Sequence, residues 1–202
     1  MGHYDLFSSI YDLSIEPHYR PQREAAAAAL DLQPGLRVLD VPCGTGLSFP
    51  HLMAGIGAAG TLLGADLSSG MLGKAKKRVA QAGWDNVVVL GCGVDDLDLD
   101  MLSGGPVDRL HMFLGLSAFP DADAGFAAAW ALLRPGGRCV VVDVWAQTLS
   151  FQGRLVNWTA KADIERRSWE PLEQRATDFQ KRDLPSTATH GGQIFLATGI
   201  KP

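Results

Sequence analysis

Residues 38–49 read VLDVPCGTGLSF, and this stretch decides the expected fold. An apolar run ends in an acid, Asp40, and two glycines, Gly44 and Gly46, follow just before an expected helix. In open α/β sheets, ligands bind beyond the carboxyl ends of the strands, where such a loop lies. Glycines let the backbone approach a ligand closely and adopt φ values that other residues avoid. The stretch therefore predicts a small-molecule site at its loop, although two glycines also suit a plain tight turn.

Strands and helices alternate on both sides of this stretch. The expected strands are 36–41, 61–66, 86–91, 107–115, 138–144 and 191–199, and the expected helices are 18–31, 46–56, 69–83 and 121–133, with a turn at 134–137. The strands are nearly continuous apolar runs rather than alternating ones. This pattern predicts a mostly parallel sheet that helices cover on both faces.

Length and composition limit the classes of protein to consider. A chain of 202 residues with 47% apolar and 20% charged residues suits one compact domain, 1–202. The net charge of −4 gives no basic surface for nucleic acid. Three distant cysteines without a CxxC pattern predict neither disulfides nor a metal site, and suit a cytoplasmic protein. No apolar run approaches the roughly 20 residues of a membrane span, so any membrane contact is expected to be peripheral.

A second acid, Asp66, ends the second expected strand twenty residues after Gly46. A carboxylate at this position can accept hydrogen bonds from a ribose diol. Capping of the next helix is the alternative role, but Ser68 and Ser69 follow directly and are good capping residues. We therefore expect Asp66 to bind a ligand.

Acidic residues follow each of the first three strands, at Asp40, at Asp66 and at Asp95–Asp96, with no Lys or Arg beside them. The third pair suits a solvated surface as well as a site. A dinucleotide site would need G-x-G-x-x-G, and Phe49 stands where the third glycine belongs. S-adenosylmethionine carries a sulfonium, an ammonium and a ribose diol, which suit the acids better than a pyrophosphate does.

Four further stretches extend this pattern: GADLSSGML (64–72), VVLGCGVDDL (88–97), GLSAFPD (115–121) and LLRPGGRCVVVD (132–143). Together with VLDVPCGTG they resemble the motifs of the class I S-adenosylmethionine-dependent methyltransferases. The resemblance implies a Rossmann-like three-layer sandwich with a mostly parallel seven-stranded sheet in the order 3-2-1-4-5-7-6. The antiparallel C-terminal strand would lie between the fifth strand and a weak strand near 178–184.

The resemblance also implies a set of cofactor-binding residues. Asp40 and the glycine loop would surround the methionine part, Asp66 the ribose hydroxyls, and Leu67 the adenine. The full set is Asp40, Pro42, Cys43, Gly44, Thr45, Gly46, Asp66, Leu67, Met71, Val94, Asp95 and Phe113. Pro42 departs from the motif, because a glycine usually stands there. The cofactor would be S-adenosylmethionine, and the product S-adenosylhomocysteine.

GTGLSFPHL, GWDNVVVL and the closing GGQIFLATG are also similar to small bacterial methyltransferases of phospholipid head groups and quinones. This predicts methyl transfer to a small or lipid-like acceptor, either a head-group amine or a quinone-type aromatic. A catalytically silent S-adenosylmethionine-binding protein and an NAD-dependent oxidoreductase are the alternatives. The sequence predicts neither the acceptor atom nor an oligomeric state.

Methyl transfer depends mainly on alignment of donor and acceptor, so the sequence need not contain a catalytic signature. Tyr11, expected to close over the cofactor, and His111 are the weak catalytic candidates, and a buried, paired histidine is the more ordinary interpretation of His111.

Two segments outside the central unit have expected roles: residues 1–33 form an N-terminal helical cap, and 145–180 a substrate lid. Within the lid, Phe151, Leu155 and Trp158 fall close to one helical face, with basic residues elsewhere. Such a face either covers a core or meets an anionic lipid surface or an apolar substrate.

Overall fold

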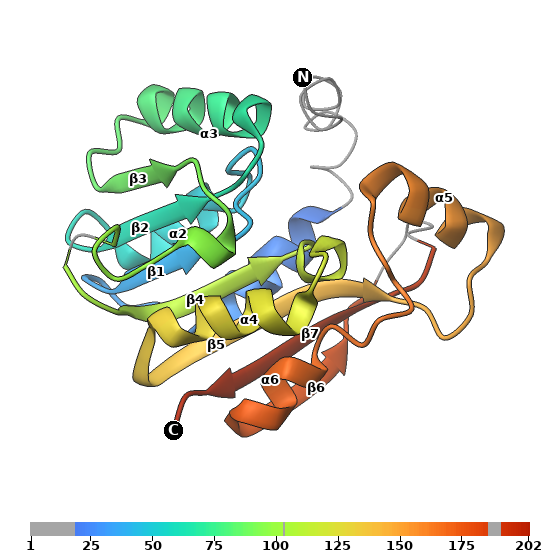
Figure 1. The fold of residues 1–202 in the computed structure, drawn as a ribbon. Coiled ribbons are helices and arrows are strands. Elements are labelled where there is room, and N and C mark those ends of the chain that lie inside the picture. The colour runs from blue at the N-terminus through green and yellow to red at the C-terminus, as the bar shows by residue number, and fades with distance from the viewer. Residues whose placement is uncertain (1–18, 103, 186–190) are drawn as a thin grey trace.

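The computed structural model describes residues 19–102, 104–185 and 191–202 (Figure 1). In these residues seven strands form one sheet in the order β3-β2-β1-β4-β5-β7-β6. The strands are β1 (Arg37–Asp40), β2 (Thr61–Ala65), β3 (Val87–Leu90), β4 (Val107–Phe113), β5 (Leu133–Trp145), β6 (Thr177–Asp183) and β7 (Gln193–Ile200). The first five pair in parallel, and β7 is antiparallel to both β5 and β6. The predicted fold class and strand order are confirmed.

Helices cover both faces of the sheet and make it the middle of three layers (Figure 1). They are a helix at 19–29, α2 (Phe49–Ile56), α3 (Ser69–Ala82), α4 (Ala122–Leu132), α5 (Phe151–Ala160) and α6 (Glu170–Arg175), with the short turns η1 (Val94–Asp96) and η2 (Leu116–Ala118). Neighbouring strand residues alternate between two cores: Val38 packs with helix 19–29, α2 and α3, and Leu39 with α4 and α6. Strands buried on both faces are why the sequence shows continuous apolar runs.

Most predicted boundaries hold within a few residues, and α3 shows why. The hydroxyl of Ser68 accepts a hydrogen bond from the backbone N–H of Met71 (3.3 Å), and Gly83 ends the helix with a φ of 66°. Both are the capping chemistry that the sequence indicated.

The predicted turn at 134–137 is wrong as a boundary, because β5 already begins at Leu133. Leu133 pairs with Val107, and the next pair joins Arg109 to Arg138, so residues 134–137 form a bulge of four residues opposite the single residue Asp108. The bulge stays in the sheet because its backbone pairs with the chain end: Gly136 N donates to Lys201 O, and Lys201 N donates to Gly137 O.

The segment 145–180 divides into two parts. Its second half belongs to the body of the protein: Leu172 of α6 is fully buried, and Trp169 packs edge-on against Trp145 and Phe195, with ring centroids 5.4 and 5.0 Å apart. Helix α5 stands away from the sheet (Figure 1), whereas the loop after it packs against the body, where Ile164 is buried and its carbonyl accepts a hydrogen bond from Ala146 N (2.8 Å). The predicted substrate lid is therefore limited to the first half of the segment, which contains α5. Of the expected cap, helix 19–29 packs on the sheet, and residues 1–18 lie outside the described residues.

Candidate active site

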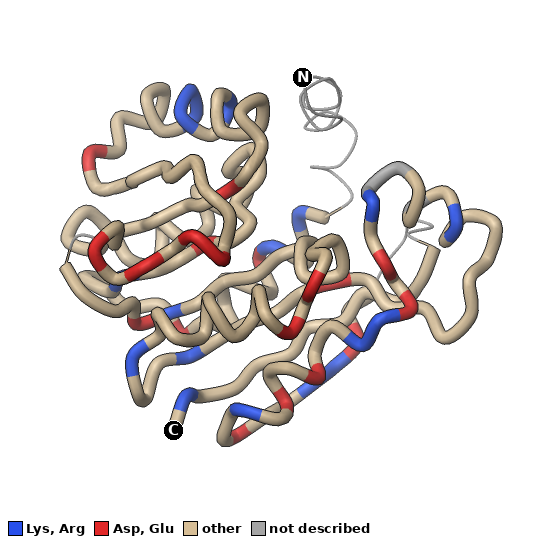
Figure 2. The backbone as a smooth tube through the Cα atoms, viewed as in Figure 1, with Lys and Arg blue, Asp and Glu red and all other residues tan. Residues whose placement is uncertain are grey.

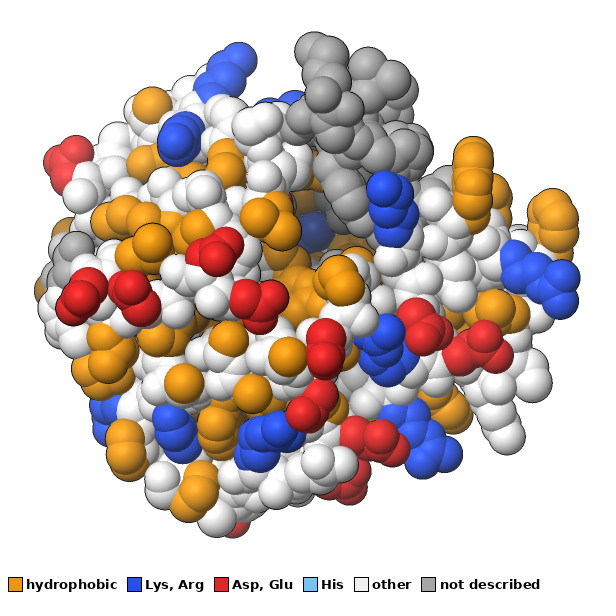
Figure 3. Space-filling view, in the orientation of Figure 1, with side chains coloured by type: hydrophobic (Ala, Val, Ile, Leu, Met, Phe, Trp, Pro, Cys, Tyr) orange, Lys and Arg blue, Asp and Glu red, His pale blue; other side chains and the backbone are white. Residues whose placement is uncertain are grey.

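A cavity of about 490 Å³ opens at the carboxyl ends of β1, β2 and β4. Its walls come from the loop after β1, the turn from β2 into α3, the η2 loop after β4, and one side chain of helix 19–29. Figure 3 shows a hollow bordered by hydrophobic side chains at this end of the sheet. The volume suits a small-molecule ligand of drug size, and the cavity lies where the sequence predicted it.

The glycine loop is shaped around Phe49. Gly44 and Gly46 adopt φ values of 55° and 75°. A Cβ at Gly46 would lie 2.8 Å from the Phe49 ring, and one at Gly64 would lie 2.6 Å from it. The aromatic ring that replaces the third glycine of a dinucleotide motif is therefore buried under the loop, and it requires glycine on both sides. Around Gly44 the space is open, so the loop backbone is accessible from the cavity.

Asp66 lies on the cavity wall, as predicted, and its carboxylate is already oriented. Oδ2 accepts a hydrogen bond from Gly44 N (2.9 Å), and Oδ1 accepts one from Ser68 N (2.8 Å). Each oxygen keeps a second lone pair that can accept a ligand hydroxyl. Burial raises the pKa of Asp66 above its ordinary value, while the two backbone donors oppose that rise. The residue is thus an acceptor with fixed geometry.

Asp40 is not among the residues that line the cavity, and its predicted place beside a ligand ammonium stays a prediction. It is buried and lies opposite His111 in the register of β1 and β4. The imidazole Nδ1 is 2.7 Å from Asp40 Oδ1, so the carboxylate accepts a hydrogen bond from the ring. His111 also stacks on Phe113, with centroids 5.8 Å apart. This buried pair matches the ordinary interpretation of His111 and leaves it without access to a substrate.

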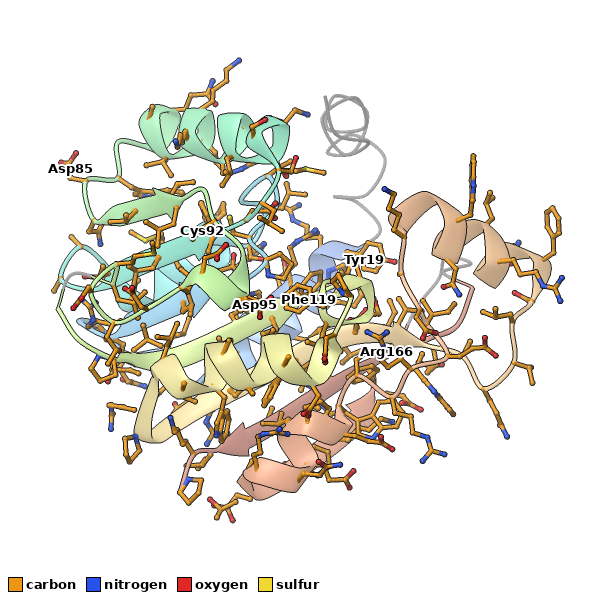
Figure 4. All side chains as sticks on the ribbon, in the orientation of Figure 1. Tyr19, Asp85, Cys92, Asp95, Phe119 and Arg166 are labelled. Atoms are coloured by element: carbon orange, nitrogen blue, oxygen red, sulfur yellow. The ribbon has the colours of Figure 1, made fainter. Side chains whose placement is uncertain are left out.

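Two of the four residues expected near the adenine line the cavity. Leu67, which is 78% exposed, and the buried Met71 both line the cavity. Val94 and Asp95 of η1 lie just beyond it: Val94 is buried, Asp95 is exposed, and a Cβ at the neighbouring Gly93 would be 3.5 Å from Leu67. Figure 4 shows Asp95 at the same end of the sheet as Phe119. Their predicted contact with the ligand stays a prediction.

The remaining predicted cofactor-binding residues are of two kinds. Those that line the cavity are Pro42, Cys43, Gly44, Thr45 and Phe113, whereas Gly46 does not line it and lies against the Phe49 ring. Burial raises the pKa of the Cys43 thiol, so this group stays protonated and forms a neutral part of the wall instead of a nucleophile.

The sequence interpretation missed Arg23, the cationic side chain that lines this cavity from helix 19–29. It is only 5% exposed, and its guanidinium carbon lies 4.9 Å from the centroid of Phe113. Tyr19, one turn earlier, meets the same ring edge-on at 6.3 Å (Figure 4). A signal was present, because Arg23 shares a helical face with the fully buried Ala26 and Leu30. A charged residue in such an apolar stripe indicates a buried role.

Tyr11, the other catalytic candidate, lies outside the described residues. Across the parts of the chain that the structure describes, no cluster of His, Cys, Asp or Glu side chains is arranged to hold a metal ion. No described helix combines the length and the apolar character needed to cross a membrane.

A comparison with known families matches residues 1–155, more than half of the chain, to the ubiE/COQ5 methyltransferase family. The chain belongs to this family. Membership makes it an S-adenosylmethionine-dependent methyltransferase and sets aside both the oxidoreductase and the silent binding protein.

Curated relatives agree over nearly the whole chain. A demethylmenaquinone methyltransferase of Parafrankia sp. (strain EAN1pec) is 28% identical, covering 98% of this chain and 74% of its own. The protein of the same name from Desulfitobacterium hafniense (strain Y51) is 25% identical and covers 98% and 85%.

Solved structures agree on the fold. Geranyl diphosphate C-methyltransferase from Streptomyces coelicolor A3(2), with Mg²⁺, geranyl-S-thiolodiphosphate and S-adenosyl-L-homocysteine, superposes with a TM-score of 0.75 at 17% identity, over 91% of this chain and 76% of that one.

The residues present fit the cofactor of this methyltransferase family. Its ribose diol matches the fixed carboxylate of Asp66, and the open backbone at Gly44 allows the methionine part to approach. Its carboxylate needs a cation, and Arg23 lines the cavity; its adenine needs an apolar wall, and Leu67 and Met71 line the cavity as well. Residues from four different elements would therefore hold S-adenosylmethionine.

Proposed function

We propose that the protein methylates a ring carbon of a demethylmenaquinone-type quinol, a lipid-like aromatic acceptor. The observation that carries the proposal is the composition of the cavity: beyond Asp66 and the glycine loop, its wall continues through Phe113, Leu114, Ala118 and Phe119. An apolar wall of this kind suits a flat aromatic ring with an isoprenoid tail better than a charged head group. The names of the most similar curated relatives support the same acceptor class.

When bound, S-adenosylmethionine supplies an activated methyl group on a sulfonium. The chain's own residues align the reactants: Asp66 fixes the ribose, Arg23 the carboxylate, and the apolar wall excludes water. Alignment of this kind can supply roughly 7–11 kcal/mol of barrier reduction. As the new carbon–carbon bond forms on the phenolate, the sulfur–carbon bond breaks, and the ring hydrogen then moves as a proton to the phenolic oxygen, which restores the quinol.

The described residues of the wall do not provide a general base. Its ionisable side chains are Arg23, Cys43 and Asp66, of which the first is a cation, the second a neutral thiol, and the third is engaged with two backbone donors. We infer that the electron density for the transfer comes from the quinol itself, as its phenolate, whose proton passes to solvent. This predicts that the reduced quinol is methylated and the oxidised quinone is not.

The η2 loop, which forms part of the acceptor side, is held by a buried carboxylate. Asp143 accepts hydrogen bonds from Ser117 N (2.8 Å), Ser117 Oγ (2.9 Å) and Val144 N (2.8 Å). Burial raises the pKa of Asp143, and these three donors counteract that rise. This carboxylate is a positioning residue for Ala118 and Phe119.

The test is transfer of a labelled methyl group to a panel of acceptors: a short-chain demethylmenaquinol, its oxidised quinone, a simple phenol and phosphatidylethanolamine. We expect a product from the quinol alone, with mass spectrometry placing the methyl group on a ring carbon. An ether product from the quinol or phenol would show that the methyl group is transferred to oxygen, and would contradict methylation of a ring carbon. A methylated amine would move the acceptor to phospholipid head groups and contradict the proposal.

An acceptor with an isoprenoid tail resides in a lipid bilayer. We therefore propose that the protein acts in the cytoplasm at a membrane surface, although no described helix can cross a membrane.

A further inference from the structure

Helix α5 presents its largest apolar side chains to solvent. Phe151 is 84% exposed, Trp158 is 74% exposed and Leu155 is 51% exposed. At about 100° of turn per residue, these three lie within about 60° of one another and form a single stripe. Figure 3 shows hydrophobic side chains projecting from the surface where α5 lies.

The opposite side of α5 carries Gly153 and Asn157, one small residue and one polar residue that contact the protein. Gly153 is buried against Gly191, where an added Cβ on Gly191 would lie 2.6 Å from the Gly153 Cα. Asn157, one turn later, accepts a hydrogen bond from Ile164 N (3.1 Å) through its side chain. The amphipathic pattern is therefore inverted relative to a helix that covers a core, because its large apolar residues point outward.

Basic residues accompany the stripe on one side. Arg154 and Lys161 are exposed, and neither forms an ion pair within the described residues. Figure 2 shows no acidic residue on α5 itself, while acids appear in the loop that follows. There Asp163 is paired with Arg166 (3.7 Å). In a chain of net charge −4, this local positive charge beside a Phe and a Trp is complementary to an anionic lipid surface.

The size of the stripe argues against a second copy of the chain as its occupant. Each large aromatic side chain buries about 150–250 Å², so Phe151 and Trp158 together bury roughly 500 Å² at most, and the half-exposed Leu155 adds less than either. A stable protein interface needs about 800 Å² from each partner. An interfacial helix needs only a narrow apolar face with cations beside it.

α5 is mechanically connected to the cavity. Asp163 N, in the loop that follows the helix, donates to Ser117 O (2.8 Å), and Arg166 Nη1 donates to Phe119 O (2.7 Å). Figure 4 shows Arg166 and Phe119 where this loop meets the η2 loop. Phe119 is part of the cavity wall. A surface that binds α5 would therefore lie close to the cavity.

We propose that α5 is a docking helix for anionic lipid bilayers, which inserts Phe151, Leu155 and Trp158 into the interface while Arg154 and Lys161 contact lipid phosphates. This deepens the proposed function by stating how a lipid-dissolved acceptor reaches the cavity. The docking itself is independent of which acceptor is methylated, because lipid alone tests it.

The experiment is flotation of the full-length protein with vesicles of phosphatidylcholine, with and without phosphatidylglycerol, at low and high salt. Wild type is expected to float with the anionic vesicles at low salt. The double variant Phe151→Ser/Trp158→Ser should lose at least about tenfold in partitioning. Arg154→Gln and Lys161→Asn should each lose about fivefold, at low salt only. Asn suits position 161 because the backbone φ there is 49°.

The matched control is Leu99→Ser/Met101→Ser, which removes two exposed apolar side chains (48% and 42% exposed) from another surface and should float like wild type. The proposal is overturned if wild type fails to float with anionic vesicles, or if the α5 variant floats as well as the control. It is also overturned if light scattering shows a wild-type dimer that the α5 variant dissociates, since a second copy would then be the occupant. Failure of the quinol assay with intact flotation would reject only the acceptor.

Discussion

Replacing Asp66 with asparagine tests the part of the site on which cofactor recognition depends. The carboxylate accepts hydrogen bonds from Gly44 N and Ser68 N, at 2.9 and 2.8 Å, and we assign its remaining lone pairs to the ribose diol. Asparagine keeps the shape but turns one oxygen into an NH₂ group. That group cannot accept from the diol, and it faces a backbone donor.

The magnitude follows from the lost interactions. A hydrogen bond to a charged acceptor contributes about 1.5–3 kcal/mol, so one lost bond weakens binding by roughly 10- to 150-fold. Alanine would leave the N–H groups of Gly44 and Ser68 without their acceptor, and would mix loss of folding stability with loss of binding. Asparagine is therefore the cleaner substitution.

The assay is isothermal titration calorimetry with S-adenosylhomocysteine, supported by a thermal melt of the free protein. Asp85→Asn is the control, because Asp85 is an exposed acid that does not line the cavity, and we expect it to change affinity less than threefold. An Asp66→Asn protein that melts like wild type and binds with unchanged affinity would refute our assignment of the ribose.

The same carboxylate gives the affinity a defined pH dependence. Burial raises the pKa of Asp66, and only the ionised form accepts hydrogen bonds at both oxygens. Affinity should therefore be full above this raised pKa and fall as the pH decreases through it. The fall should begin at a higher pH than an exposed aspartate would produce, and it should be absent from Asp66→Asn.

Three further substitutions probe the surrounding elements. Arg23→Gln removes the cation opposite the cofactor carboxylate and should weaken S-adenosylhomocysteine at least about tenfold by calorimetry, with less effect on adenosine, which lacks that carboxylate. Gly46→Ala places a Cβ 2.8 Å from Phe49 at a φ of 75°, so we expect a loss of about 2–4 kcal/mol in the free energy of unfolding by denaturant titration, reduced by Phe49→Leu. Asp143→Asn should loosen the η2 loop and raise the KM for the acceptor at unchanged cofactor affinity, measured by steady-state kinetics.

The sequence predicted those parts of the site that are local in the chain. The loop at 42–46, the acid at the end of β2 and the cap at Ser68 each need only a few neighbouring residues, and the structure places all three where the pattern indicated. The strand order followed from the resemblance, and it placed β7 correctly between β5 and β6.

What the sequence could not supply was contact between distant segments. Asp40 and His111 become partners because β1 and β4 pair in a particular register, and a shift of one residue would turn the two side chains to opposite faces. Arg23 reaches the cavity because helix 19–29 packs beneath the sheet at Phe113. The Asp40–His111 pair is not visible in a pattern of neighbouring residues, and the helical spacing of Arg23 indicates only that it is buried, not what it contacts.

These two contacts change the electrostatic character of the site. Three acids at strand ends indicated a ligand with positive charge, but Asp40 Oδ1 is paired with His111, and neither Asp40 nor Asp95 lines the cavity. Asp66 remains at β2, and Arg23 stands beside Phe113 of β4, two strand spacings of about 4.8 Å away.

The cavity therefore has an anionic end and a cationic end rather than a uniform negative charge. A ligand that places hydroxyl donors at one end and a carboxylate at the other satisfies both, and a purely cationic ligand satisfies only one. S-adenosylhomocysteine, which lacks the sulfonium charge but keeps the diol and the carboxylate, should for this reason bind about as tightly as S-adenosylmethionine. Competition between the two in the calorimeter tests this: a preference of tenfold or more for the sulfonium would show that positive charge still governs recognition.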